Sequence, residues 1–285
     1  MAIHTLGVIG TGAMGSGIIE VAAKAGVMVI ARDINAGAVE AGQGKVEGSM
    51  AKAVARGKLD EAARDAAVAN ITWTTEMADL APCDLVIEAA PENLELKKEI
   101  FTELDGILGA DAVIATNTSS YPIIEVAMVT GRADKVVGMH FFNPATVMKL
   151  VEVISTQRTS DDTKATADAF ATDVLGKRVV HCKDRAGFVV NMLLVPYLCQ
   201  AMRMFENGHA SAADIDEAMK LGTGHPMGPL ELSDMIGLDV MLWTAESLHD
   251  EYNEAFYAPP PLLRRMVAAG QLGRKTGQGF YTYET

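Results

Sequence analysis

The sequence predicts an α/β protein, with an N-terminal Rossmann-type domain built on a parallel sheet and a smaller all-helical C-terminal domain. Three observations support this prediction. A strand, a glycine-rich turn, a helix and a second strand follow one another near the N-terminus, which is the βαβ unit of a parallel sheet. Apolar runs typical of buried strands continue to residue 154, and the pattern then becomes helical after about residue 185. We therefore expect one domain over residues 1–184 and a second over 185–285.

The first two strands are expected at the apolar runs Thr5–Ile9 and Val27–Ala31, with a helix at about 15–25 between them. Residues 36–69 are rich in Ala, Glu, Lys and Arg and lack proline, so they favour a helical stretch. The other elements of this domain are expected as strands at Leu85–Glu88, Val113–Ala115, Val136–Phe142 and Leu150–Ile154, with a helix at 95–108.

In the C-terminal domain the expected helical runs are 186–207, 211–221, 228–249 and 260–269. Ser211 and Asp214 form a capping box at the start of one of them. A β pattern returns only at Gly279–Tyr283. The apolar helix at 186–204 needs more cover than a small domain supplies, so we expect this domain to form a homodimer.

Composition excludes several classes of protein. The formal net charge of −13 argues against a nucleic-acid binder, whose affinity comes largely from Lys and Arg on phosphates. No run of about 18 apolar residues occurs, so we expect no membrane span. The three separated cysteines, Cys83, Cys182 and Cys199, form neither a disulfide framework nor a metal knuckle. With no basic segment typical of a secretion signal, we expect a cytoplasmic protein without a metal.

The first turn has the pattern GxGxxG, as Gly10-Thr11-Gly12-Ala13-Met14-Gly15, after a strand and before a helix. In this context the glycines permit a tight turn, close approach of a pyrophosphate, and close packing of helix on strand. The helix N-terminus offers N–H groups to the phosphates. Asp33 ends the second strand, where a carboxylate accepts from ribose hydroxyls and repels a 2′-phosphate. These features predict a dinucleotide site that prefers NAD to NADP, although Arg32 lies next to Asp33.

Two polar residues, His140 and Glu152, lie inside apolar strands that a short connection at Asn143-Pro144 could bring together. An imidazole held by a carboxylate is the usual general base near neutral pH, but a purely structural His–Glu pair fits the pattern equally well. Residues Asn117–Ser120 follow a strand at its carboxyl end, where open α/β sheets bind ligands, although an ordinary polar turn has the same composition.

A further pattern is the series Lys45, Ser49, Lys52 and Arg56, whose spacing places these side chains on one face of a helix. In a chain this acidic, such a donor-rich face could bind a nucleotide phosphate. The alternative, which the spacing alone favours, is an ordinary solvated helix face.

Taken together, these residues resemble the short, monofunctional bacterial 3-hydroxyacyl-CoA dehydrogenases, the type that acts on 3-hydroxybutyryl-CoA. The resemblance covers essentially the whole chain. Its most specific segments are GVIGTGAMGSGI (7–18), EAAPENLELK (88–97), ATNTSS (115–120), GMHFFNPATVMKLVEV (138–153), DRAGFVVN (184–191), HPMGPLEL (225–232) and GRKTGQGFYTY (273–283). The chain departs from the family pattern at Thr146, where a second proline is usual, and at Met192, where arginine is common.

The resemblance implies roles for individual residues. His140 would be the general base for the 3-hydroxyl proton, and Glu152 would orient it and stabilise its imidazolium. Ser119 would hydrogen-bond the substrate oxygen, and Asn191 would help to hold the substrate and the reacting imidazole. The implied NAD-binding residues are Gly10, Thr11, Gly12, Ala13, Met14, Gly15, Asp33, Glu92, Lys97, Ser119, Asn143 and Lys275, and Ser49 and Arg56, with Ser119, would contact the CoA substrate.

The expected function is therefore reversible, NAD-dependent oxidation of a short-chain (3S)-3-hydroxyacyl-CoA to the 3-oxoacyl-CoA, a reaction of fatty-acid metabolism. Two alternatives remain at this level: a gulonate-type sugar-acid dehydrogenase with the same fold, and an NAD-binding sensor or structural protein without turnover. A serine hydrolase using Ser119, His140 and Glu152 is rejected, because Ser119 lacks a GxSxG elbow and the chain order differs from that of α/β-hydrolases.

Overall fold

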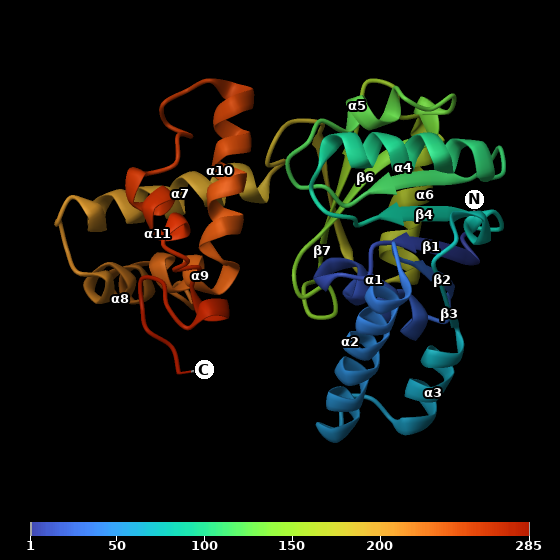
Figure 1. The fold of residues 1–285 in the computed structure, drawn as a ribbon, viewed down its shortest axis with the longest axis horizontal. Helices are drawn as coiled ribbons and strands as arrows, with labels where there is room; N and C mark the ends of the chain where they lie inside the picture. Colours follow the sequence, from blue (N-terminus) through green and yellow to red (C-terminus); the bar gives the residue numbers. More distant parts are fainter. Residues whose placement is uncertain (1, 285) are drawn as a thin grey trace. The chain divides into compact units, whose positions relative to one another are not determined.

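The structure is a computed structural model that describes residues 2–284, and it confirms the predicted fold class (Figure 1). The chain divides into two compact units, a first unit that ends at Asp184 and a second unit that begins at Arg185. In Figure 1 the first unit runs from blue to olive along the chain and contains the sheet, whereas the second unit, orange to red, is built from helices.

The first unit is organised around one eight-stranded sheet with the order β3-β2-β1-β4-β5-β6-β7-β8. Its strands are β1 (Thr5–Ile9), β2 (Met28–Arg32), β3 (Ile71–Thr74), β4 (Leu85–Glu88), β5 (Val113–Thr116), β6 (Val136–Phe141), β7 (Leu150–Ser155) and β8 (Arg178–Lys183). Neighbouring strands are parallel except for β6 and β7, which pair antiparallel. From β1 the chain winds outward to β3, then returns to place β4 on the other side of β1. Open α/β sheets bind ligands at such a switch point, beyond the carboxyl ends of the strands.

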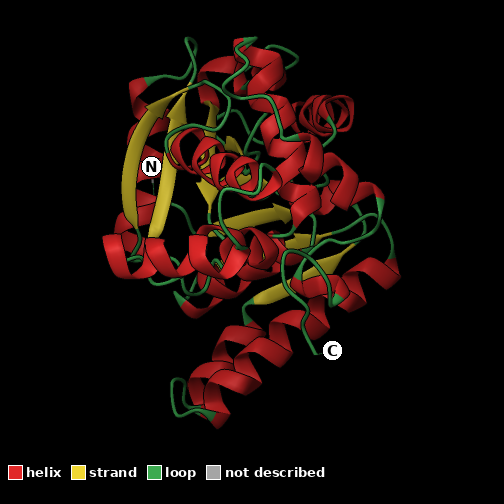
Figure 2. Cartoon of the chain, turned by 90° about the vertical axis from the view of Figure 1, so that its left-hand side faces the viewer, coloured by secondary structure: helices red, strands yellow, loops and turns green. Residues whose placement is uncertain are grey.

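Helices on both sides of this sheet bury its apolar strands. They are α1 (Ala13–Lys24), α2 (Ala36–Ala55), α3 (Glu61–Ala69), α4 (Leu94–Ile107), α5 (Ile123–Ala127) and α6 (Asp161–Ala169), with the short 3₁₀ helices η1 (Met77–Leu80) and η2 (Ala133–Lys135) and the π-helix η3 (Phe170–Val174). Figure 2 shows the strands in yellow between red helices. Strands β4 and β5 are buried along their whole length, because a parallel sheet is covered on both faces.

The predicted helical stretch 36–69 is two helices rather than one. Helix α2 ends at Ala55, and Gly57 then adopts φ +65°, a left-handed conformation that glycine tolerates and a continuing helix does not. Asp60 begins α3, because its side chain accepts a hydrogen bond from the backbone N–H of Ala63 at 2.7 Å. The two helices pack against each other and extend together below the sheet in Figure 1.

Strands β3 and β8 form the two edges of the sheet, and the sequence pattern does not predict either of them. Edge strands pair on one side only and need few apolar residues. Accordingly, β3 is half-buried along most of its length, and every residue of β8 is either exposed or half-buried. Their side chains include Thr72 and Thr74 in β3 and His181 and Lys183 in β8, so neither segment has the continuous apolar run that marks a central strand.

The second unit contains α7 (Val190–Glu206), α8 (Ala212–Thr223), α9 (Pro229–Ile236), α10 (Leu238–Tyr252), α11 (Pro261–Ala268) and the turn η4 (Arg274–Thr276). The predicted run 228–249 is two helices, because Gly237 interrupts it with φ +104°. Residues 279–283 do not form the expected strand, although Gln278 makes isolated bridges to Gly273 and Thr282. The buried Asp234 carboxylate instead accepts from the N–H groups of Phe280 and Tyr281.

Within residues 2–284, no helix combines the length and the apolar character needed to cross a membrane. The same part of the chain brings together no group of three or more His, Cys, Asp or Glu side chains suited to a metal ion.

Candidate active site

A cavity of about 600 Å³ opens at the switch point of the sheet in the first unit. Its lining comes from the glycine-rich turn after β1, from the end of β2, from the loop after β4 and from one face of α4. Apolar side chains Ile34, Met77, Leu96 and Ile100 form part of its wall. The volume and the mixture of apolar walls with a few polar groups are typical of small-molecule and cofactor sites.

The three glycines of the turn have different surroundings. A Cβ at Gly15 would lie 1.7 Å from the carbonyl oxygen of Gly10, and one at Gly10, whose φ is +91°, would lie 2.5 Å from the carbonyl oxygen of Ala89. A Cβ at Gly12, in contrast, meets no atom within 4 Å. Gly10 and Gly15 are therefore required by packing, whereas Gly12 keeps open the space next to the N-terminus of α1 where a pyrophosphate can approach.

Asp33 lies just beyond β2 and is linked to the same turn. One of its oxygens accepts hydrogen bonds from the Thr11 N–H at 2.6 Å and the Thr11 hydroxyl at 2.7 Å, and the other accepts from the Ile34 N–H at 2.7 Å. Partial burial opposes its ionisation, but these hydrogen bonds and Arg32 outweigh that effect and hold the pKa of Asp33 below its ordinary value. A carboxylate has about four acceptor positions, so an ionised Asp33 retains capacity for a ribose hydroxyl.

Glu92, Lys97 and Ser119 come together where the loops after β4 and β5 meet. The Glu92 carboxylate accepts from the Ser119 N–H at 3.1 Å and from the Thr118 hydroxyl at 2.9 Å. The Lys97 side chain is only 1% exposed, and its Nζ lies 2.7 Å from Oε1 of Glu88. Lys97 and Glu92 also line the large cavity, so the structure brings these predicted residues to one place.

The most direct agreement with the sequence prediction is the pairing of His140 and Glu152. The two residues lie directly opposite each other in the antiparallel register of β6 and β7, so that their side chains share one face of the sheet. His140 Nδ1 lies 2.7 Å from Glu152 Oε2, and the two side chains are 8% and 0% exposed. A buried carboxylate next to an imidazole fixes the ring orientation and directs the other ring nitrogen, Nε2, away from the pair.

Asn143 and Ser49 line a second, smaller pocket of about 120 Å³ at the connection between β6 and β7. Lys45 of α2 and the first turn of α1 contribute to the same pocket. The connection is held in place by Lys177, whose Nζ donates to the carbonyl oxygens of Ala145 at 2.6 Å and Met148 at 2.7 Å.

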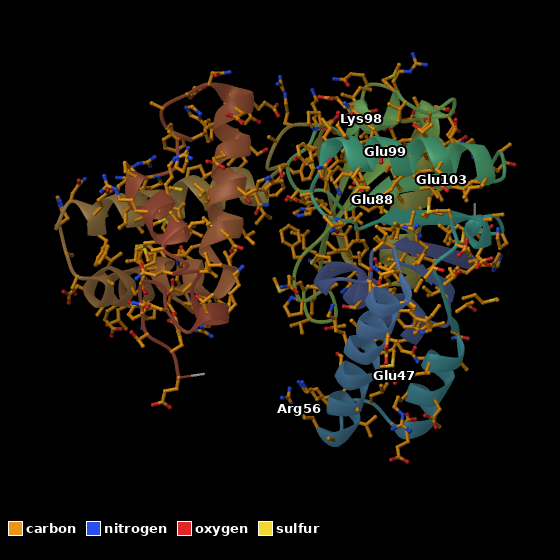
Figure 3. The ribbon with its side chains drawn as sticks, in the orientation of Figure 1. Glu47, Arg56, Glu88, Lys98, Glu99 and Glu103 are labelled. Atoms are coloured by element: carbon orange, nitrogen blue, oxygen red, sulfur yellow. The ribbon has the colours of Figure 1, made fainter. Side chains whose placement is uncertain are left out.

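Of the basic face predicted on α2, only part lies at this pocket. Lys45 and Ser49 line it, whereas Lys52 and Arg56 are exposed on the remaining turns of the helix. Figure 3 shows Arg56 at the end of α2, with its side chain directed away from the sheet. The exposed side chain of Arg56 is thus available to a ligand that extends along α2.

Two predicted site residues, Asn191 and Lys275, belong to the second unit. Asn191 is half-buried in the first turn of α7. Lys275 lies in η4, and its Nζ is 2.5 Å and 2.6 Å from the two carboxylate oxygens of Asp239. Within this unit, therefore, Lys275 is engaged by an acidic side chain.

Two further buried polar residues shape the site: Glu88, to which the sequence prediction gives no role, and Asn117, which it includes only as part of the segment 117–120. Glu88, at the end of β4, is fully buried, and Asn117, after β5, accepts a hydrogen bond from the Phe141 N–H at 2.9 Å through Oδ1. Asn117 also lines the large cavity, so it links that cavity to the residue next to His140. The available signal for Glu88 is a carboxylate that ends an otherwise apolar strand nine residues before a lysine, as the Lys97–Glu88 pair shows.

Comparison with known proteins identifies a family for both units. The family described as "3-hydroxyacyl-CoA dehydrogenase, NAD binding domain" matches residues 5–185, and "3-hydroxyacyl-CoA dehydrogenase, C-terminal domain" matches residues 187–283. The chain is 50% identical over 283 residues to a 3-hydroxybutyryl-CoA dehydrogenase of Mycobacterium tuberculosis, covering 99% of each chain.

Solved structures resemble the chain over its full length. The crystal structure of FadB2 from M. tuberculosis has 50% identity and a TM-score of 0.99, and covers 100% of both chains. That of (S)-3-hydroxybutyryl-CoA dehydrogenase PaaH1 from Ralstonia eutropha has 47% identity and a TM-score of 0.95, again over 100% of both chains.

Proposed function

Since this chain belongs to the 3-hydroxyacyl-CoA dehydrogenase family and is an NAD-dependent dehydrogenase, we propose that it interconverts short-chain (3S)-3-hydroxyacyl-CoA and 3-oxoacyl-CoA thioesters. The observation that supports this proposal most strongly is the buried His140–Glu152 pair on strands that share a sheet with the dinucleotide cavity. His140 is near the carboxyl end of β6, which runs parallel to β5, so it lies toward the edge of the sheet where the cavity opens.

The cavity fits NAD. Gly12 leaves room for a pyrophosphate beside the N-terminus of α1, and the ionised Asp33 is placed to accept from ribose hydroxyls. The same carboxylate would repel a 2′-phosphate, so we expect NADPH to be a poor substitute for NADH. When bound, the cofactor supplies a nicotinamide ring that accepts or returns a hydride at C3 of the substrate.

His140 serves as the general base in this proposal. Its Nδ1 faces Glu152, so Nε2 is the nitrogen that takes the proton from the substrate 3-hydroxyl. The imidazolium that results is stabilised by the Glu152 carboxylate. The Ser119 hydroxyl keeps its proton and donates a hydrogen bond to the substrate oxygen, which stabilises the charge that develops there. In the reverse direction His140 returns the proton to the same oxygen. Asn191 and Lys275, in the second unit, keep their expected roles toward substrate and cofactor as part of the proposal.

Activity with a CoA ester tests the proposed function. We expect NADH oxidation with acetoacetyl-CoA, little with NADPH, and none with free acetoacetate, because the exposed donors of α2 recognise the CoA portion. Absorbance at the nicotinamide band measures all three reactions. If NADH binds but the ester is not reduced, the proposed substrate is wrong, and gulonate and related sugar acids become the next substrates to test.

The proposal predicts a specific effect for Arg56. Replacing Arg56 with alanine should raise the KM for acetoacetyl-CoA by about 2–5-fold and leave kcat unchanged, because one exposed charge contact to a phosphate is lost. The KM for the pantetheine thioester of acetoacetate, which lacks the nucleotide, should not change. Arg64→Ala on α3 is the matched control, since Arg64 pairs with its neighbour Asp65 at 2.8 Å. An equal rise in KM for both thioesters would exclude this role for Arg56.

The homodimer and the cytoplasmic location remain predictions. The homodimer is supported by large apolar side chains exposed on helices of the second unit, among them Leu193 of α7 (71% exposed) and Leu221 of α8 (78% exposed). Such side chains are costly to leave in water when they form a continuous patch, so a second copy of the chain would be a suitable cover.

A further inference from the structure

We propose that Glu88 is a positioning residue for the reaction, which acts through Lys97 and Glu92 on the loop that presents Ser119. This inference rests on the proposed function, in which the Ser119 hydroxyl binds the substrate oxygen. Three carboxylate and ammonium groups form a connected chain from the end of β4 to this loop. Figure 3 shows Glu88 at the end of β4, close to α4.

Glu88 is fully buried and is surrounded by donors. Its Oε1 accepts from the Ala90 N–H and from Lys97 Nζ, and its Oε2 accepts from the Thr116 hydroxyl, all at 2.7 Å. Thr116 is the last residue of β5, and its oxygen in turn accepts from the Thr118 N–H at 3.1 Å. One carboxylate therefore joins the ends of β4 and β5 to the first turns of α4.

Lys97 connects Glu88 to Glu92. Its Nζ reaches Glu88 at 2.7 Å, the carbonyl oxygen of Ala90 at 3.4 Å and Oε2 of Glu92 at 3.5 Å. At 1% exposure, this ammonium group depends on protein partners for the stabilisation that water would otherwise provide. Glu88 makes the shortest of these contacts, so Glu88 determines where the Lys97 charge lies.

Glu92 connects Lys97 to the loop that carries Thr118 and Ser119. It binds the Ser119 N–H and the Thr118 hydroxyl only as an acceptor, which favours its ionised form. Burial nevertheless raises the pKa of Glu92, and Glu88 adds to the rise, while Lys97, Thr118 and Ser119 act in the opposite direction. The Tyr121 hydroxyl donates to the Glu92 backbone oxygen at 3.3 Å. Among these neighbours, Lys97 is the cation that opposes the rise in the pKa of Glu92.

A purely structural role makes a different prediction from a positioning role. A buried ion pair contributes little net stability, and replacing both partners together with uncharged groups is often neutral. If the pair serves stability alone, removing one charge should lower both the thermal midpoint and kcat, and removing both charges should restore both quantities. If it positions Ser119, stability should return but turnover should not.

The test compares Glu88→Gln, Lys97→Met and the double variant in the full-length protein with acetoacetyl-CoA and saturating NADH, so that the loss of the implied contact between Lys97 and the cofactor does not limit the measured kcat. Each single variant should lower both the thermal midpoint and kcat, because one buried charge loses its partner. The double variant should recover most of the thermal midpoint, while kcat stays about tenfold or more below the wild type, because small displacements of a reacting group are costly. The KM for the CoA ester should change less than kcat, since Ser49 and Arg56 are not affected and Ser119 acts mainly on the charge that develops on the substrate oxygen.

The pH profile provides a second readout. Loss of the Lys97 charge raises the pKa of Glu92 further, so in Lys97→Met the activity should begin to fall at a higher pH as the solution is acidified. Lys98→Met is the control, because Lys98, the next residue on α4, pairs with Glu95 and Glu125 at the surface and should leave kcat and the profile unchanged.

The outcomes separate the two proposals. A wild-type protein that binds NADH but does not reduce acetoacetyl-CoA would defeat the proposed function, and this inference with it. An active wild type together with a double variant that recovers kcat as well as the thermal midpoint would overturn the role of Glu88 alone. The same conclusion would follow if Lys97→Met kept the wild-type pH profile.

Discussion

Replacing His140 with alanine is expected to lower kcat for the reduction of acetoacetyl-CoA by about 10²–10⁴-fold, the usual contribution of positioned proton transfer. The imidazole is held against the fully buried Glu152 at 2.7 Å, and a methyl group cannot supply a proton to the substrate oxygen. NADH affinity should remain within about twofold of the wild type, because the cofactor cavity is built from other residues. Steady-state kinetics and a fluorescence titration of NADH measure the two quantities.

The chain offers a matched control for this variant. His181 on β8 also pairs with a carboxylate, since its Nε2 lies 2.8 Å and 2.9 Å from the two oxygens of Asp168, but its side chain is 49% exposed. His181→Ala removes a His–carboxylate pair at the surface and should leave kcat unchanged. Comparable losses in the two variants, or a His140→Ala protein with nearly full turnover, would contradict the assignment of His140 as the base.

A variant of Glu152 tests the second half of the same assignment, the stabilisation of the imidazolium. An amide at this position in Glu152→Gln keeps the size of the side chain but removes the charge that stabilises the imidazolium. We expect a smaller loss of kcat than for His140→Ala, because the proton-transfer group itself is still present.

The sequence predicts the central part of the fold and the site because short-range patterns determine them. The βαβ unit follows from two apolar runs around GxGxxG, and Asp33 follows from its distance along the chain. The His140–Glu152 contact could be anticipated because a short connection between two strands leaves few registers, and both polar residues then have to share one face.

Other features depend on contacts that the local pattern does not contain. The edge strands β3 and β8 are stabilised by pairing with β2 and β7, not by an apolar run of their own. In the sequence, Glu88 has the pattern of an ordinary strand end. Its role depends on Thr116 and Lys97, which contact it only in the folded chain. The role of Lys97 changes for the same reason: the resemblance implies contact with the cofactor, and the structure adds an ion pair with Glu88.

The glycine-rich turn allows packing and cofactor binding to be separated experimentally. Gly15→Ala would place a Cβ 1.7 Å from the carbonyl oxygen of Gly10, so α1 must move away from β1. Overpacking of this kind typically costs about 1–3 kcal/mol or more, and each kcal/mol lowers the melting temperature of a chain of this size by about 2–4 °C. We expect a lower melting temperature in calorimetry together with loss of NADH binding, because the displaced helix N-terminus no longer meets the phosphates.

Gly12→Ala should weaken NADH binding without the loss of stability expected for Gly15→Ala. Its Cβ meets no protein atom within 4 Å, so the melting temperature of the cofactor-free protein should be unchanged. The added methyl group would instead occupy the space that the pyrophosphate needs, and NADH affinity should fall by about tenfold or more, equivalent to about 1.4 kcal/mol. A Gly12→Ala protein that binds NADH as tightly as the wild type would show that the cofactor does not approach this turn. Because the two glycines are three residues apart in one turn, only their different surroundings can account for such a contrast.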